Sequence, residues 1–209
     1  MVDLTHLDPR ERAVTERVIH ASAEVAYARD LVMNEADLER GHAALQNGAL
    51  VITDTRMTKA GISGDRAVAL ADFCADHRSR SGPLACSRTT STTDSASPKD
   101  DDAPPPASRT AAWVRTAVAR GACGAVWAFA GAPTALEELL RLADAAAPAF
   151  IIGLPVGFVG AVEAKQALRA SGLASISNRS VRGGAAVAAA ACNALIFLDP
   201  STVSARNAR

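Results

Sequence analysis

A short apolar run, a glycine-rich turn and a helix-forming run follow one another within residues 148–165 (PAFIIGLPVGFVGAVEAK). Residues 149–154 have the length and composition of a buried strand, and residues 161–170 have those of a helix. Gly157 and Gly160 permit a tight turn between them. Because a helix N-terminus carries unpaired N–H donors and partial positive charge, this order of elements predicts an α/β fold with an anion-binding turn.

The spacing of the glycines argues against a nicotinamide site. From Gly153 onward they follow G-x-x-x-G-x-x-G rather than the dinucleotide fingerprint G-x-G-x-x-G. No acidic residue stands at the distance expected for a ribose contact on a following strand. The turn therefore predicts an anion site but not a dinucleotide.

Strand, polar turn and helix recur four times, at residues 49–61, 125–145, 149–171 and 174–197. Alternating units of this kind predict a parallel sheet covered by helices. We therefore expect an α/β fold, three-layer and doubly wound, with a mainly parallel sheet and helices on both faces, as a single domain over residues 1–209. In such sheets ligands bind beyond the carboxyl ends of the strands, where the four polar turns should gather.

The N-terminal part is expected to add helices to this sheet. Asp8, followed by proline, is a favourable helix start, and an apolar stripe runs from there to about His20. Residues 22–33 indicate a loop with a short extended or helical piece, and Asn34 is placed to cap a helix over residues 35–46. Further helices are expected at residues 109–119, 135–146 and 161–170, with a last one ending near residue 198.

Composition excludes several classes of partner. Lys+Arg and Asp+Glu both number 22, so the net charge is zero and nothing favours a nucleic-acid partner. No apolar stretch reaches the roughly 18–20 residues that span a membrane, and the N-terminus lacks a secretory apolar segment. The cysteines form no C-x-x-C pair, which is typical of reduced thiols in the cytoplasm. They are Cys74, Cys86, Cys123 and Cys192.

Residues 81–108 differ from the rest of the chain. Ser, Thr, Asp and Pro dominate from Ser87 onward, and the segment includes DDD at 100–102 and PPP at 104–106. Such a stretch cannot bury enough apolar surface to offset its ordering entropy. We expect a disordered surface insertion here.

Five blocks along the chain resemble the signatures of one enzyme family. They are TERVIH at residues 15–20, VITDTRM at 51–57, GAPTAL at 131–136, IIGLPVGFVGAVEAK at 151–165 and RGGAAVAAA at 182–190. Together they resemble the precorrin-8X / cobalt-precorrin-8 methylmutases of cobalamin biosynthesis. The resemblance implies an isomerase that moves a methyl group between neighbouring ring carbons of a corrinoid, giving hydrogenobyrinic or cobyrinic acid. It implies no cofactor and no protein-held metal, since any metal belongs to the substrate.

The resemblance covers most of residues 9–76 and 108–198 and fails between them. The resemblance implies a strand followed by an ordered helical connection there, and the Phe73–Asp76 fragment resembles the end of that strand. Gly131 also replaces an asparagine of the family's turn. These departures leave a catalytically impaired tetrapyrrole-binding paralogue as an alternative function. A third possible function, from another class of protein, is that of a nucleotide-binding α/β domain.

His20 is the candidate catalytic group. Imidazole titrates near neutrality and can donate and recover a proton within one turnover. Arg17 lies three residues earlier on the same helical face, and a guanidinium can hold a carboxylate through two hydrogen bonds. A single helical histidine is more often packed or solvated than catalytic. The resemblance implies the catalytic role, because the matching family histidine is proton donor and acceptor and the matching arginine contacts substrate.

The remaining substrate-binding candidates lie in or beside the polar turns. A surface arginine is usually solvated, and a threonine at a helix start is often a cap. The resemblance implies instead that arginines, together with backbone N–H groups of the glycine turns, meet the peripheral carboxylates of a corrinoid. The candidates are Arg109, Thr134, Gly157, Arg182, Gly183 and Gly184.

Other polar residues have simpler interpretations. Asp54 and Arg56 are expected to pair with each other, and Glu163 and Lys165 are expected to be solvated at the start of their helix. His6 lies in the N-terminal tail and His42 on an expected exposed helix face. His77 with Cys74 forms half of a zinc site at best, without a second pair.

A homodimer is expected from the resemblance alone, because the relatives complete their sites at a subunit interface. Composition is silent on the oligomeric state. The expected partners are thus a corrinoid substrate and a second copy of the chain, with neither nucleic acid nor membrane.

Overall fold

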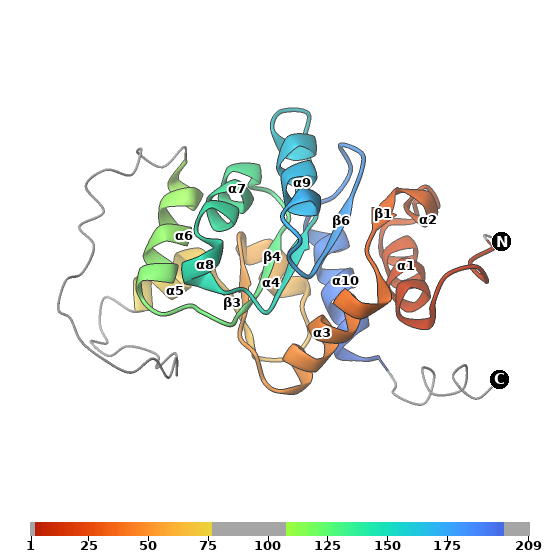
Figure 1. The fold of residues 1–209 in the computed structure, drawn as a ribbon, viewed down its shortest axis with the longest axis horizontal. Helices are drawn as coiled ribbons and strands as arrows, with labels where there is room; N and C mark the ends of the chain where they lie inside the picture. Colours follow the sequence, from red (N-terminus) through yellow and green to blue (C-terminus); the bar gives the residue numbers. More distant parts are fainter. Residues whose placement is uncertain (1–2, 77–107, 199–209) are drawn as a thin grey trace.

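The computed structural model describes residues 3–76 and 108–198, which form one sheet covered by helices (Figure 1). The strands are β1 (Leu31–Val32), β2 (Val51–Thr53), β3 (Ala67–Ala69), β4 (Val126–Phe129), β5 (Phe150–Gly153) and β6 (Ser175–Asn178). Their order is β1-β6-β5-β4-β2-β3, with β1 antiparallel to β6 and the other neighbours parallel.

Two helices precede β1 in the described ranges, and each strand is then followed by one or two helices. The helices in these ranges are α1 (Pro9–Ser22), α2 (Tyr27–Asp30), α3 (Glu35–Gln46), α4 (Arg56–Gly61), α5 (Leu70–Asp76), α6 (Arg109–Ala119), α7 (Pro133–Arg141), α8 (Ala143–Ala146), α9 (Ala161–Ala170) and α10 (Ala185–Ile196). None of these helices has the length and apolar character needed to cross a bilayer.

The direction in which the chain adds strands to the sheet reverses between β2 and β4. From β2 the chain moves outward to β3, then crosses back to β4 and continues through β5 to β6. The carboxyl ends of β2 and β4 therefore flank a topological switch point, which is where doubly wound sheets usually bind ligands.

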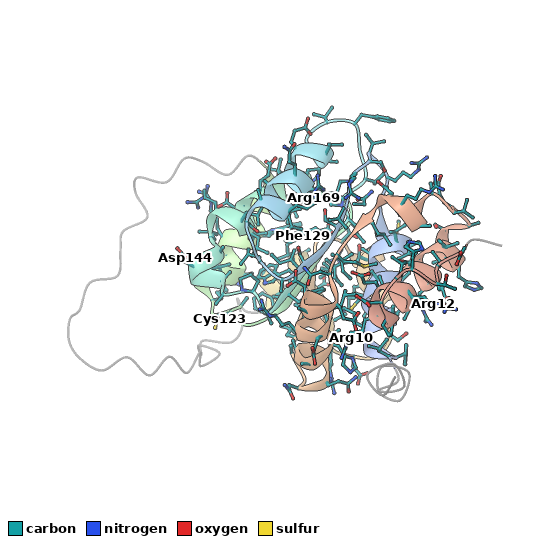
Figure 2. The ribbon with its side chains drawn as sticks, turned by 45° about the vertical axis from the view of Figure 1, so that its right-hand side comes forward. Arg10, Arg12, Cys123, Phe129, Asp144 and Arg169 are labelled. Atoms are coloured by element: carbon teal, nitrogen blue, oxygen red, sulfur yellow. The ribbon has the colours of Figure 1, made fainter. Side chains whose placement is uncertain are left out.

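Two apolar layers fill the space between the sheet and its helices. The first packs α1, α3 and α10 on one face, and the second packs α5, α6, α7 and α9 on the other (Figure 1). Within β4 the side chains alternate: Val126 and Ala128 join the first layer, while Trp127 and Phe129 join the second. Figure 2 shows Phe129 enclosed in the interior. The predicted three-layer, doubly wound, mainly parallel α/β fold is confirmed.

Several elements match their sequence predictions closely. Helices α3, α6 and α9 have the predicted limits, and Asn34 caps α3 by accepting a hydrogen bond from the Asp37 N–H at 2.8 Å. The predicted helix over residues 135–146 begins earlier, at Pro133, and divides into α7 and α8.

The β3–α5 unit is the main error of the sequence prediction. The chain forms a strand at Ala67–Ala69 and then a helix from Leu70, so Phe73–Asp76 is helical and not the end of a strand. Three residues, two of them alanine, carry too little β-signal to be recognised in isolation. The buried side chains of Leu70 and Phe73 instead face the second apolar layer, where α6 packs.

The expected disordered insertion at 81–108 lies outside the described residues except at its last position. Ser108 belongs to the ordered part of the chain: its hydroxyl accepts a hydrogen bond from the Ala111 N–H at 3.1 Å and caps α6. The single-domain prediction over residues 1–209 stays a prediction.

Close packing of α9 on the sheet yields a stability prediction. A Cβ added to Gly153 would stand 2.3 Å from Leu168 Cδ2 and 3.3 Å from Leu136 Cδ2. We expect Gly153→Ala to lower the free energy of unfolding by about 1–3 kcal/mol, because the extra carbon overpacks a filled core. Urea denaturation measures this loss. In a Leu168→Ala background the same substitution should cost less, and an equal cost would contradict the packing explanation.

Candidate active site

Three turns at the carboxyl edge of the sheet are tied together by backbone hydrogen bonds. We call residues 130–134, 154–160 and 179–184, which follow β4, β5 and β6, the rim. The N–H of Val156 donates to Ala130 O at 3.1 Å, and the N–H of Gly157 donates to Val181 O at 3.0 Å. The N–H of Gly184 donates to Leu154 O at 2.9 Å. The predicted convergence of these turns at one edge is therefore confirmed.

The fourth turn, after β2, joins the rim through a carboxylate. Asp54 Oδ2 accepts hydrogen bonds from the N–H groups of Ala130, Gly131 and Ala132, at 2.9, 2.7 and 2.9 Å. Burial raises the pKa of Asp54, and the donated N–H bonds oppose part of that rise. The pairing of Asp54 with Arg56 expected from sequence is wrong, because Arg56 binds Asp72 at 2.6 Å.

This carboxylate occupies the switch point. The three N–H groups before α7 form the concave donor set that often binds a phosphate in α/β proteins, and here the protein fills that set itself. The arrangement gives no support to the nucleotide-binding alternative.

Glycine is required where the rim turns approach one another. A Cβ on Gly183 would lie 2.1 Å from Leu154 O, and Gly183 has a φ of 151°. Gly184 has a φ of 112° and Gly157 a φ of 147°, conformations that other residues rarely adopt. These three glycines thus set the backbone path of the rim.

Two helices start at the rim without a side-chain cap. Gly160 precedes the ten-residue α9, Gly184 precedes the twelve-residue α10, and no side chain caps either helix. Because the first N–H groups of a helix lack intrahelical partners, both starts present donors and partial positive charge. The rim therefore offers two neighbouring positions suited to carboxylate groups.

His20 lies in the last turn of α1, four residues before Glu24, and its side chain is exposed. The link to the rim is the ion pair between Glu24 Oε1 and Arg182 Nε at 3.0 Å, since Glu24 follows the end of α1. Both partners of this pair are substantially exposed, so the ion pair contributes little stability.

Arg17 makes its contact at the C-terminal end of α10, whereas Arg182 lies just before the N-terminal end of that helix. Its guanidinium carbon lies 5.6 Å from the centre of the Phe197 ring, just past the C-terminus of α10. The Arg182–Glu24 contact lies at the N-terminus of the same helix, about 18 Å away at 1.5 Å per residue. The structure therefore places Arg17 away from the rim turns, one helical turn before His20.

Arg109 and Thr134 lie together at the β4 side of the rim. Thr134 Oγ1 and Ser108 Oγ are 2.7 Å apart, which joins the starts of α7 and α6. The Arg109 guanidinium carbon lies 5.3 Å from the centre of the Trp113 ring, and the arginine is exposed. Arg109, Thr134, Gly157, Arg182, Gly183 and Gly184 thus lie at or beside one edge of the sheet.

The rim also carries exposed apolar side chains. Phe158 is 91% exposed and Val159 is 89% exposed, and Val156 beside them is about half exposed. Met57, in the first turn of α4, is exposed too. Neighbouring exposed apolar side chains, as at residues 156–159, are typical of a surface that another molecule covers. The sequence predictions named the glycines of this turn and missed its apolar side chains.

A buried polar network beneath the β6–α10 turn was also missed. Lys165 is fully buried and donates to Asn178 Oδ1 at 2.9 Å, so its predicted solvation is wrong, whereas Glu163 is exposed as expected. Asn178 Nδ2 in turn donates to Asp30 Oδ2 at 2.8 Å. Asp30 Oδ1 also accepts the N–H of Ser180 at 2.8 Å.

The Asp30 carboxylate yields a pH-dependent stability prediction. Burial opposes its ionisation, but hydrogen bonds from Asn178, Ser180 and Arg179 outweigh burial and lower the pKa of Asp30 below its ordinary 3.8. We therefore expect Asp30→Asn to cost about 1–3 kcal/mol near neutral pH, where the carboxylate is charged in both states. The difference from wild type should shrink as the pH falls from 3.8 through the lower folded-state pKa. Urea titrations at several pH values measure it, and a pH-independent difference would contradict the assignment.

Two remaining predictions concern histidine. His42 was expected on an exposed face, but its Nδ1 lies 2.8 Å from Leu195 O and the residue is only partly exposed. His77 of the half zinc site lies outside the described residues, and Cys74 is buried with its Sγ 3.5 Å from Trp113 O. Among the described residues no cluster of three metal-ligating side chains occurs.

Two cavities in the described part of the chain have no rim residue in their lining. One of about 530 Å³ lies between the ends of α3 and α10, lined by residues that include Leu45, Val51 and Arg66. This is the amino edge of the sheet, opposite the rim. Arg66 in this cavity already donates to Leu45 O at 2.7 Å. The rim, which gathers the uncapped helix starts and the glycine turns, remains the better candidate for the active site.

Comparison with known proteins identifies the family. The precorrin-8X methylmutase family model matches residues 1–198. A cobalt-precorrin-8 methylmutase of Methanothermobacter thermautotrophicus is 34% identical over 202 residues, covering 94% of this chain and 85% of the relative. A precorrin-8X methylmutase of Pseudomonas aeruginosa is 38% identical over 183 residues, covering 86% and 80%. The crystal structure of a precorrin-8X methylmutase from Thermus thermophilus superposes with a TM-score of 0.70 at 28% identity, covering 92% and 87%. The chain belongs to the precorrin-8X methylmutase family.

Proposed function

We propose that this chain is an isomerase that moves a methyl group between adjacent ring carbons of precorrin-8X or cobalt-precorrin-8, giving hydrogenobyrinic or cobyrinic acid. Membership of the methylmutase family is the observation that carries the proposal. The rim supports it, because it combines exposed apolar side chains with uncapped helix starts and a weakly held arginine. A flat macrocycle with carboxylate side chains has the complementary chemistry.

Substrate binding then divides between two kinds of contact. Arg182 and the first N–H groups of α9 and α10 bind peripheral carboxylates, with Arg109 and Thr134 contributing from the far side of the rim. Phe158 and Val159 cover apolar ring surface, which removes it from water. Arg17 reaches a carboxylate only after leaving the Phe197 ring.

His20 supplies the proton chemistry. Its imidazolium donates a proton to the conjugated macrocycle, which polarises the ring system and lowers the barrier to methyl migration. The methyl group moves to the neighbouring carbon, and the imidazole recovers one proton from the product. No atom or electron is gained or lost overall, so the step is an isomerisation that needs only one proton-transferring group. A cobalt ion, when present, belongs to the substrate.

A second copy of the chain completes the site in this proposal. His20 is exposed, and so are Phe158 and Val159. A homodimer that covers these surfaces would exclude water from the reacting ring, and we place this assembly in the cytoplasm. Sedimentation equilibrium should give twice the chain mass. A monomer at micromolar concentration, with or without corrinoid, would contradict the dimer.

Incubation of the purified protein with precorrin-8X, with and without cobalt, tests the function. The visible spectrum should change to that of hydrogenobyrinic or cobyrinic acid. Binding without turnover would support the impaired paralogue instead. A failure to bind either corrinoid would overturn the proposal, and a thermal shift with nucleotide alone would then favour the nucleotide-binding alternative.

A further inference from the structure

The buried ammonium of Lys165 donates two of its three hydrogen bonds to backbone carbonyls of the rim. Its Nζ donates to Ser180 O at 2.5 Å and to Arg182 O at 2.9 Å, besides the bond to Asn178 Oδ1. Ser180 and Arg182 belong to the turn between β6 and α10, and Asn178 is the last residue of β6. Burying an ammonium is costly, and here no carboxylate touches it directly, because Asn178 stands between it and Asp30.

The bonds from Lys165 fix the direction of two peptide groups. In a trans peptide the C=O of one residue and the N–H of the next point in opposite directions. With the Ser180 and Arg182 carbonyls held inward on Lys165, the N–H groups of Val181 and Gly183 point away from the interior. Asn178 Nδ2 adds a bond to Arg182 O at 3.0 Å and strengthens the same orientation.

These two N–H groups have no acceptor within residues 3–76 and 108–198, whereas their neighbours do. The Arg182 N–H donates to Ser180 Oγ at 3.1 Å, and the Gly184 N–H donates to Leu154 O. Both unpaired groups lie in the rim, immediately before the uncapped start of α10. Amides two residues apart that point the same way form a donor pair suited to a carboxylate.

We propose that Lys165 is a positioning residue: by holding the Ser180 and Arg182 carbonyls inward, it presents the Val181 and Gly183 N–H groups to one peripheral carboxylate of the corrinoid. The inference rests on the proposed function and deepens it, because it assigns the donors that recognise one acid side chain of the macrocycle. Burial lowers the pKa of Lys165 to about 8, so keeping this ammonium charged beneath the rim has an energetic cost.

The helix that carries Lys165 provides a matched control. Arg169 follows one turn later on α9 (Figure 2), and it too binds β6, donating to Asn178 O at 2.7 Å. It contacts neither the Ser180 nor the Arg182 carbonyl. Arg169→Met therefore removes a cation from the same helix without releasing the two peptide groups.

Binding of cobyrinic acid, and of an analogue with amides in place of its side-chain carboxylates, tests the role. We expect Lys165→Met to weaken binding of the acid about tenfold or more, the loss of one to two charge-assisted hydrogen bonds. Binding of the amide analogue should change much less, and Arg169→Met should bind both as wild type does. An equal loss for acid and amide would overturn the proposal, because general damage to the fold does not discriminate between them.

A second measurement uses the wild-type protein and so does not depend on the variant folding. In nitrogen-15 NMR spectra, cobyrinic acid should shift the amide signals of Val181 and Gly183 downfield, as new hydrogen bonds do. If the ligand shifts other rim amides but not these two, the positioning role is wrong while the proposed function stands. If no rim amide shifts and no binding is seen, the proposed function itself fails.

Discussion

We expect His20→Ala to abolish nearly all turnover while corrinoid binding survives. We expect the rate of methyl migration to fall by about 10²–10⁴-fold, the usual contribution of one general acid–base group. His20 is exposed in the last turn of α1, so its loss removes no buried contact and should leave the melting temperature almost unchanged. Single-turnover absorption spectroscopy with precorrin-8X measures the rate, and a titration with cobyrinic acid measures the binding.

His6→Ala is the matched control for this substitution. It removes another exposed histidine, from the segment before α1, and should retain the wild-type rate. A wild-type rate in His20→Ala would show that another group transfers the proton. A loss of binding in His20→Ala, with the rate of the bound fraction intact, would assign the residue to substrate recognition instead.

Gly183→Ala should damage both the fold and corrinoid binding. Its Cβ would lie 2.1 Å from Leu154 O and 2.9 Å from the Leu154 carbonyl carbon, and backbone cannot move aside as a flexible side chain can. The φ of 151° is also unfavourable for alanine. Strain and overpacking together are expected to lower the free energy of unfolding by about 2–6 kcal/mol.

The binding loss follows from the same clash. To accept a Cβ, the β6–α10 turn must move away from Leu154, which breaks the Gly184–Leu154 hydrogen bond and shifts the start of α10. Chemical denaturation and corrinoid titration measure the two effects. Gly131→Ala is the control for stability, because its Cβ would meet Thr55 at an ordinary 3.5 Å. Equal stability of the two variants would contradict the close approach of the turns.

The strand–turn–helix units were predictable because their signals are local. The apolar run of β5, the glycines after it and the alanine-rich α9 each carry their own preference, so the fold class and the limits of α9 were correct. The β3–α5 unit failed for the same reason, since Ala67–Ala69 is too short to carry a pattern of its own.

The contacts of charged residues at the rim were much less predictable. Asp54 binds N–H groups that lie 76 to 78 residues later in the chain, and no local pattern indicates such a pairing. The sequence predicts a solvated Lys165 because Glu163 and Lys165 both lie in the first turns of a helix. A usable signal did exist: Lys165 falls on the buried stripe formed by Ala161, Ala164 and Leu168, spaced as one face of a helix.

A crystal structure of the protein with cobyrinic acid would test the central claim most directly. We predict that the macrocycle lies on the rim, with carboxylates at Arg182 and at the starts of α9 and α10 and with His20 of the same or the partner subunit at its edge. A corrinoid seated instead in the cavity between the ends of α3 and α10, away from every rim turn, would contradict this account.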